Sequence, residues 1–98
     1  MEYNQIEIKN VKSGETKIYT IKEISWVRDM QITNECLNAD HQSVNQTELW
    51  IRRLQEATGE EDTTLRNMDR RTFEMLVLKW IEINDVDRAA FLGPKITE

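Results

Sequence analysis

Residues 69–83 read DRRTFEMLVLKWIEI and form the most strongly helical segment of the chain. Asp69 is a favourable N-cap, so the segment predicts a helix over residues 70–83, about 20 Å long. A helix that is apolar on two sides either lies at the centre of a domain or contacts another molecule. The main apolar stripe consists of Phe73, Leu76, Val77, Trp80 and Ile81, with Ile83 as a further candidate, and Met75 and Leu78 lie on the opposite side.

The polar pair Asn84-Asp85 interrupts this apolar pattern. Asp85 can cap a last short helix, which we expect over residues 86–92. Gly93-Pro94 then ends it, because neither residue continues a helix well.

Two elements precede the central segment. Residues 60–68 are an acidic connection with one short helical turn, and residues 44–58 have the apolar spacing of a helix. Ser43 and Gln46 have the spacing of a capping box at the start of that helix. Gly59 ends it, in the position where a left-handed backbone is common.

Residues 3–21 have the pattern of an antiparallel β-hairpin. Ile6 and Ile8 alternate with charged residues, which is the period of a strand with one buried face. The second half, residues 16–21, is rich in β-branched and aromatic residues. Gly14 can take a positive φ and marks the turn between the two strands.

A helix over residues 26–38 follows the hairpin, with Ser25 as its N-cap. At about 100° per residue, one face of it is apolar, and we expect this face to lie on the hairpin. We also expect the large aromatic side chains to be in the core, because a chain of this size needs them there. The apolar face carries Trp26, Val27, Met30, Thr33 and Leu37, and the expected core aromatics are Trp26, Trp50, Phe73 and Trp80.

These elements together predict an α+β fold, in which an N-terminal two-stranded β-hairpin is followed by three to four α-helices and the chain is mostly helical. The length of 98 residues, with 39% apolar and 32% charged side chains, fits one small domain over residues 1–98.

The charge and cysteine content restrict the function classes. Thirteen basic and 18 acidic residues give a net charge of -5, which disfavours nucleic acid as a partner. Cys36 is the single cysteine, so it cannot form an internal disulfide, and a reducing compartment is expected. No signal peptide and no apolar run of about 20 residues are visible. We therefore expect a cytoplasmic protein that does not bind a membrane.

The residues that could carry chemistry are few, and we expect no enzyme, no cofactor and no metal site. His41 is the single histidine and lies in an expected loop. Cys36 is five residues away, yet a zinc site needs three or four such ligands. Asp85 and Asp87 begin like a calcium loop, but the central Gly and closing Glu are missing, so helix capping explains them better.

The sequence features that stand out are apolar residues on predicted helices, which are typical of surfaces that bind another helix. From the helical projections we predict six residues that bind a partner. They are Leu49, Met75, Leu78, Ile83, Phe91 and Leu92.

Two stretches resemble the small tail assembly chaperones of long-tailed phages and related proviruses. Residues 17–26, KIYTIKEISW, run from a second hairpin strand directly into a helix. Residues 65–92 begin with Leu-x-x-Met-Asp-x-x-x-Phe-x-x-Leu and look like the C-terminal helices of that family, which follow an acidic or polar loop. The resemblance covers most of the chain. It rests on the pattern of apolar and polar residues and includes no invariant motif.

This resemblance implies a protein without catalytic activity that binds the helical tape measure protein in the cytoplasm of the infected cell. Tail tube protein would displace the chaperone, which would be absent from the virion. In many members a longer frameshifted product shares the N-terminal part, and homo-oligomers are compatible with the role.

Two other classes stay open. The protein could be a structural virion component, such as a head-tail connector or a minor tail protein, which would purify with particles. It could also be a small acidic inhibitor that occupies the basic cleft of a DNA-binding protein. Acidic and basic residues are interleaved along every predicted element, which disfavours the inhibitor.

Overall fold

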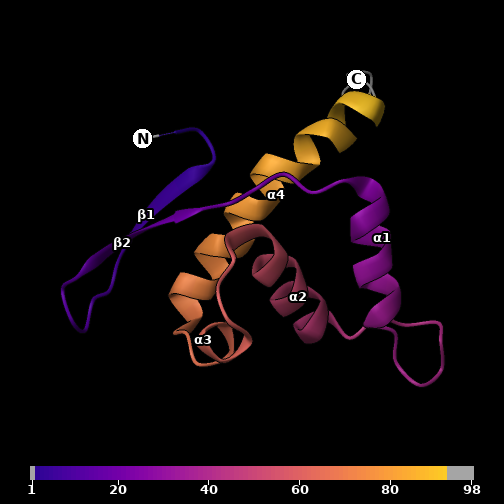
Figure 1. The fold of residues 1–98 in the computed structure, drawn as a ribbon, viewed down its shortest axis with the longest axis horizontal. Helices are drawn as coiled ribbons and strands as arrows, with labels where there is room; N and C mark the ends of the chain where they lie inside the picture. The colour runs from indigo at the N-terminus through magenta and orange to yellow at the C-terminus, as the bar shows by residue number, and fades with distance from the viewer. Residues whose placement is uncertain (1, 93–98) are drawn as a thin grey trace.

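The computed structural model describes residues 2–92, with side chains described for residues 2–84. An antiparallel hairpin precedes helices that make up most of the chain, which confirms the predicted α+β class (Figure 1). The elements are β1 (Gln5–Lys9), β2 (Thr16–Thr20), α1 (Trp26–Glu35), α2 (Gln46–Thr58), α3 (Asp62–Arg66) and α4 (Arg70–Leu92).

The hairpin has the predicted alternation of buried and exposed side chains. Ile6 lies opposite Tyr19 in the register, and Ile8 and Tyr19 are buried on the face towards the helices. Ile18 belongs to the other face and is 54% exposed. Gly14 has a φ of 78°, as the turn prediction requires. One face of the sheet is therefore part of the core.

The ends of the first two helices differ from the prediction. Helix α1 ends at Glu35 rather than at residue 38, because Leu37 leaves the helix and forms an isolated β-bridge with Val44. Helix α2 begins at Gln46 rather than at residue 44, and Asn45 is its N-cap, accepting a hydrogen bond from the backbone N–H of Glu48 at 3.1 Å.

The predicted cap, Ser43, is engaged elsewhere. Its Oγ atom donates to Asp40 Oδ2 at 3.0 Å, within the loop that the β-bridge closes. The other end of α2 follows the prediction, since Gly59 has a φ of 78° in the C-cap position. Local competition for the Ser43 hydroxyl therefore moved the start of the helix.

Helix α4 is longer than predicted. Asp69 caps it, accepting the backbone N–H of Thr72 at 3.0 Å, which confirms the predicted start. The expected break at Asn84-Asp85, with a separate helix over residues 86–92, is wrong, because the helix runs uninterrupted to Leu92. The Asn84 side chain accepts the backbone N–H of Ile24 at 2.8 Å, so a tertiary contact uses the amide that could have ended the helix.

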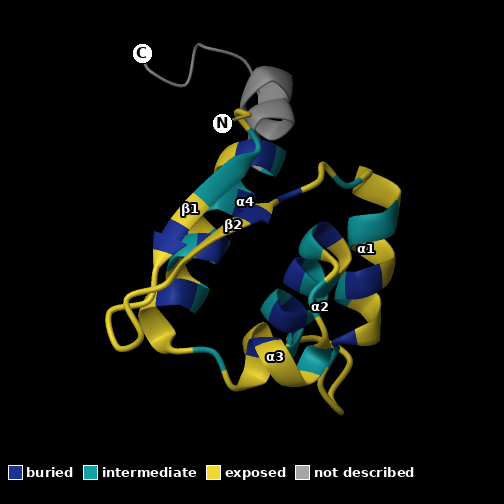
Figure 2. Cartoon of the chain, turned by 60° about the vertical axis from the view of Figure 1, so that its left-hand side comes forward, coloured by how far each residue is buried: buried dark blue, intermediate teal, exposed yellow. Residues whose placement is uncertain are grey.

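The main core lies where α4 packs against β1 on one side and α2 on the other (Figure 2). Trp50 and Trp80 meet edge to face, with ring centroids 5.2 Å apart. Trp80 is buried, and Trp50 and Phe73 are half-buried against the same cluster, as predicted. The buried members are Ile8, Tyr19, Ile21, Ile51, Leu54, Ala57, Leu65, Leu76, Trp80 and Ile83.

Helix α1 does not lie on the hairpin, and its predicted buried face is wrong. It packs against α2, on the side of α2 away from the hairpin (Figures 1 and 2). Trp26, Val27 and Met30 are 74%, 47% and 53% exposed. The helix instead buries Ile32, which forms a second, smaller cluster with Cys36 and Leu49.

Candidate functional site

The candidate site is the exposed apolar surface of α1, formed by Trp26, Val27 and Met30 and called here the α1 outer face. Residues spaced by three and four positions share one side of a helix, as Val27 and Trp26 do with Met30. Gln31 and Asn34 are also exposed and are uncharged. In a chain with 32% charged residues, this side of α1 consists of apolar and amide side chains only.

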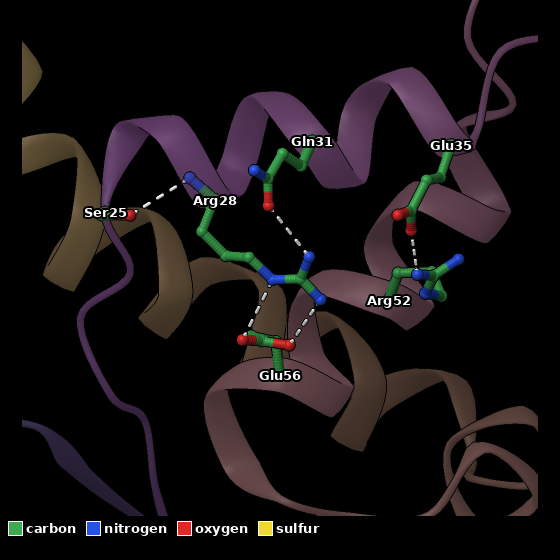
Figure 3. A network of polar contacts seen from close by, with 6 residues as sticks. All are labelled: Ser25, Arg28, Gln31, Glu35, Arg52 and Glu56. Atoms are coloured by element: carbon green, nitrogen blue, oxygen red, sulfur yellow. Dashed lines mark hydrogen bonds and ion pairs between the residues drawn. The ribbon is translucent and has the colours of Figure 1, made fainter.

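The charged side chains of α1 form ion pairs with α2 instead (Figure 3). The Arg28 guanidinium contacts both carboxylate oxygens of Glu56, with Nε to Oε2 and Nη2 to Oε1 each at 3.2 Å. Glu35 pairs with Arg52 near the other end of the helix. The charged side chains of α1 therefore face α2 together with the buried Ile32, while the apolar side chains of the α1 outer face contact solvent.

A third ion pair joins the middle of α1 to the main core. Arg53 donates to both oxygens of Asp29, from Nε at 2.8 Å and from Nη2 at 2.9 Å. The same guanidinium carbon lies 4.8 Å from the Trp50 ring centroid and 4.6 Å from the Trp80 ring centroid. This pair is the most buried of the three, with side chains 17% and 24% exposed.

The electrostatics of this layer favour the charged forms. The hydrogen bond from Arg28 holds the pKa of Glu56 below its ordinary value, and the same bond raises the pKa of Arg28. Ion pairing of this kind orients α1 and leaves its outer face without charge. Such a surface can bind an apolar partner, while titratable groups suited to catalysis do not converge on it.

The predicted binding residues do not form one surface. Leu49 lies off the main stripe of its helix and yet is buried in the small cluster. Ile83, which the sequence also offers as a member of the main stripe, is buried in the main core. Met75 is half-buried against the main core, and Leu78 is 66% exposed. Phe91 and Leu92 lie in α4 beyond the residues whose side chains are described.

Sequence reasoning missed the α1 outer face because periodicity identifies an apolar stripe but not what covers it. The signal that could have found it is the match between Asp29 and Glu35 on α1 and Arg52 and Arg53 on α2. Acids of the same helix, such as Glu48 and Glu56, are close enough in sequence to predict local ion pairs for these arginines. That prediction is wrong for both, since each pairs with an acid of α1.

The other polar side chains that could carry chemistry do not come together in one site within the described residues. His41 is exposed in a loop with a φ of 58°. Cys36 is buried in the small cluster, and burial raises its pKa. In the acidic connection, Asp62 Oδ1 lies 2.6 Å from Arg66 Nε, so this carboxylate is used in an ion pair. Asp85 and Asp87 lie outside the residues whose side chains are described.

Within the described residues, no group of three or more His, Cys, Asp or Glu side chains is arranged to hold a metal ion. None of the helices in that part of the chain combines the length and apolar character that a membrane span requires. Comparisons with protein-family models, with curated proteins and with solved structures found no match to this chain.

Proposed function

We propose that this protein is a non-enzymatic tail assembly chaperone of a phage or provirus, which binds the helical tape measure protein through the α1 outer face. The binding would take place in the cytoplasm of the host cell, until tail tube protein displaces the chaperone. The observation that carries the proposal is the orientation of α1. Its outer apolar side chains are exposed, and its charged side chains pair with α2.

The chemistry of the α1 outer face suits a helical partner. Trp26 is a large, flat anchor of the type enriched at the centre of protein interfaces. Met30 adapts its shape to irregular apolar surfaces, and it lies one helical turn from Trp26. A partner helix with an apolar stripe can cover both, and it needs no charge at the contact because the face has none.

The size of the α1 outer face favours contact that can be reversed. A fully covered aromatic side chain buries about 150–250 Å², and Trp26 is the one aromatic residue of this face. Val27 and Met30 are smaller in exposed area, at 47% and 53%, so the face provides less than the about 800 Å² per partner typical of a stable complex. One copy would bind weakly, and copies along a long partner would bind more strongly together. Competition by another protein can then remove the chaperone.

The test is to express the chain together with a helical tape measure fragment and to measure the mass of the soluble complex by light scattering. Trp26→Glu and Met30→Glu should each weaken the complex, because a charge is placed in the apolar contact. Leu78→Glu on α4 is the matched control, with the same added charge at another exposed apolar residue.

The outcomes separate the alternatives. If Leu78→Glu or Met75→Asp abolishes the complex while the α1 variants keep it, the partner binds α4 rather than α1. A partner that stays insoluble with the unaltered chain would contradict the chaperone. Recovery of the chain in purified particles would favour a structural virion component.

A further inference from the structure

We propose that α1 is a salt-releasable strap, which opens away from α2 as a unit while the main core stays folded. The strap is the segment from Trp26 to Cys36, and its opening uncovers Cys36 and Leu49. This inference concerns the protein alone and does not depend on the proposed function.

The first argument is the division of the apolar core into two clusters. The main cluster includes residues from β1, β2, α2, α3 and α4, but its buried members include none from α1. The strap contributes Ile32 and Cys36 to the small cluster, which they form with Leu49 of α2. Opening of α1 therefore uncovers three buried side chains and leaves the larger cluster intact.

The second argument is the composition of the remaining contact. Arg28 and Glu56 have side chains 37% and 41% exposed, and Arg52 and Glu35 have side chains 36% and 49% exposed. Ion pairs this open to water contribute little stability and are screened by salt. The third pair, between Arg53 and Asp29, has side chains only 17% and 24% exposed and is the main charged contact that opening has to break. Apolar burial holds most packed helices, whereas here the charged contacts surround only a small apolar centre.

The third argument is that both ends of the strap have defined attachment points. Before it, the backbone N–H of Ile24 donates to Asn84 of α4 at 2.8 Å, and Ile24 packs against both clusters. After it, the β-bridge between Leu37 and Val44 closes the loop that leads to α2. The contact of Ile24 belongs to the segment before the strap and is kept on opening. The backbone hydrogen bond from the N–H of Asn45 to the carbonyl of Cys36, 2.8 Å long, ends on the strap itself and has to break.

Opening would change the surface that the protein presents. With the strap closed, Trp26, Val27 and Met30 are exposed. With the strap open, Ile32 and Leu49 become accessible as well, and α1 is then apolar on two sides. The closed and open states therefore differ in the apolar area available to a partner.

Cys36 makes the opening measurable, because it is the single cysteine and is buried under the closed strap. N-ethylmaleimide is an uncharged reagent, so its rate of reaction with Cys36 should follow the open fraction. We expect this rate, divided by that of free cysteine at the same salt, to rise at least about threefold between 0.05 and 1 M NaCl. Intrinsic fluorescence should show that the core tryptophans stay packed.

Charge variants test the cause. Arg28→Gln removes the pair with Glu56 and should raise the labelling rate at low salt about two- to fivefold, while reducing its salt dependence. Arg70→Gln is the matched control, because it removes the same charge from an ion pair within α4, where the Arg70 side chain is 89% exposed. It should leave the labelling rate unchanged.

Hydrogen exchange gives a second measurement that does not use the thiol. Amides of α1 should exchange faster as salt increases, while those of α4 should stay protected. Labelling of Cys36 and hydrogen exchange in α1 that occur only with global unfolding would refute the strap. Labelling rates that respond neither to salt nor to Arg28→Gln would refute it as well.

Discussion

The guanidinium carbon of Arg53 lies 4.6 Å from the centroid of the Trp80 ring. Arg53 also lies 4.8 Å from the Trp50 ring centroid and holds both carboxylate oxygens of Asp29. One side chain thus links α1, α2 and α4. A planar guanidinium can stack on rings while its edge binds a carboxylate, which an ammonium group cannot do.

Arg53→Lys should therefore destabilise the protein although it keeps the charge. We expect the free energy of unfolding in urea to fall by about 1–2 kcal/mol, from weaker ring contacts and loss of the two-point contact with Asp29. Arg52→Lys is the control, because Arg52 forms an exposed pair with Glu35. Equal effects of the two substitutions would show that stacking on the tryptophans adds nothing.

Two leucines on α4 provide a matched test of burial. Leu76 is fully buried and Leu78 is 66% exposed. Leu76→Ala should cost about 2–5 kcal/mol of stability, because it removes buried methyl groups and leaves a cavity. Leu78→Ala should stay within about 0.5 kcal/mol. Thermal or urea unfolding checks both, and a large loss with Leu78→Ala would contradict the position of α4.

Gly59 ends α2 with a φ of 78°, and a Cβ added there would meet nothing within 4 Å. The cost of a side chain is therefore one of backbone conformation alone. Gly59→Ala should lower the free energy of unfolding by about 1 kcal/mol, and Gly59→Asn by less, since Asn tolerates the left-handed region. Equal stability of the glycine and alanine proteins would refute the left-handed cap.

Stability should fall in acid, with Glu56 as one cause. The hydrogen bond from Arg28 lowers the pKa of Glu56 in the folded state below its value of 4.5 in the unfolded chain. The unfolded state then binds more protons, so this stabilisation is complete above pH 4.5 and is lost as the pH falls through the lower, folded pKa.

The measurement is the free energy of unfolding as a function of pH. Glu56→Gln should flatten the acid side of the profile, whereas Glu7→Gln, at an exposed residue of β1, serves as the control. An acid profile that Glu56→Gln leaves unchanged would contradict the contribution of this ion pair.

Local interactions made much of the fold predictable. Alternation in residues 3–21, the cap at Asp69 and the left-handed end at Gly59 each depend on neighbours in the sequence, and each is present in the structure. Local competition for side chains explains the errors at helix ends. The cap moved from Ser43 to Asn45 because Asp40 binds the Ser43 hydroxyl.

The candidate site was not predictable in the same way. The apolar stripe of Trp26, Val27 and Met30 is visible in the sequence, and the expectation that it would be buried was physically reasonable. The outcome differs because α1 packs on α2 through Ile32 and Cys36, with three ion pairs around them that join residues 17, 24 and 28 positions apart. These contacts are distant in sequence, and they place the charged side of α1 against α2.

The sequence alone therefore determined the class of fold, the hairpin and the helix boundaries at Trp26, Thr58 and Arg70, because these follow from spacing and capping within a few residues. Tertiary structure decided which sides of α1 and α4 are exposed, because exposure depends on the element that packs against each side. Leu49 and Leu78 both lie off the main stripes of their helices, yet one is buried and the other exposed. Only α1, packed over Leu49, makes the difference.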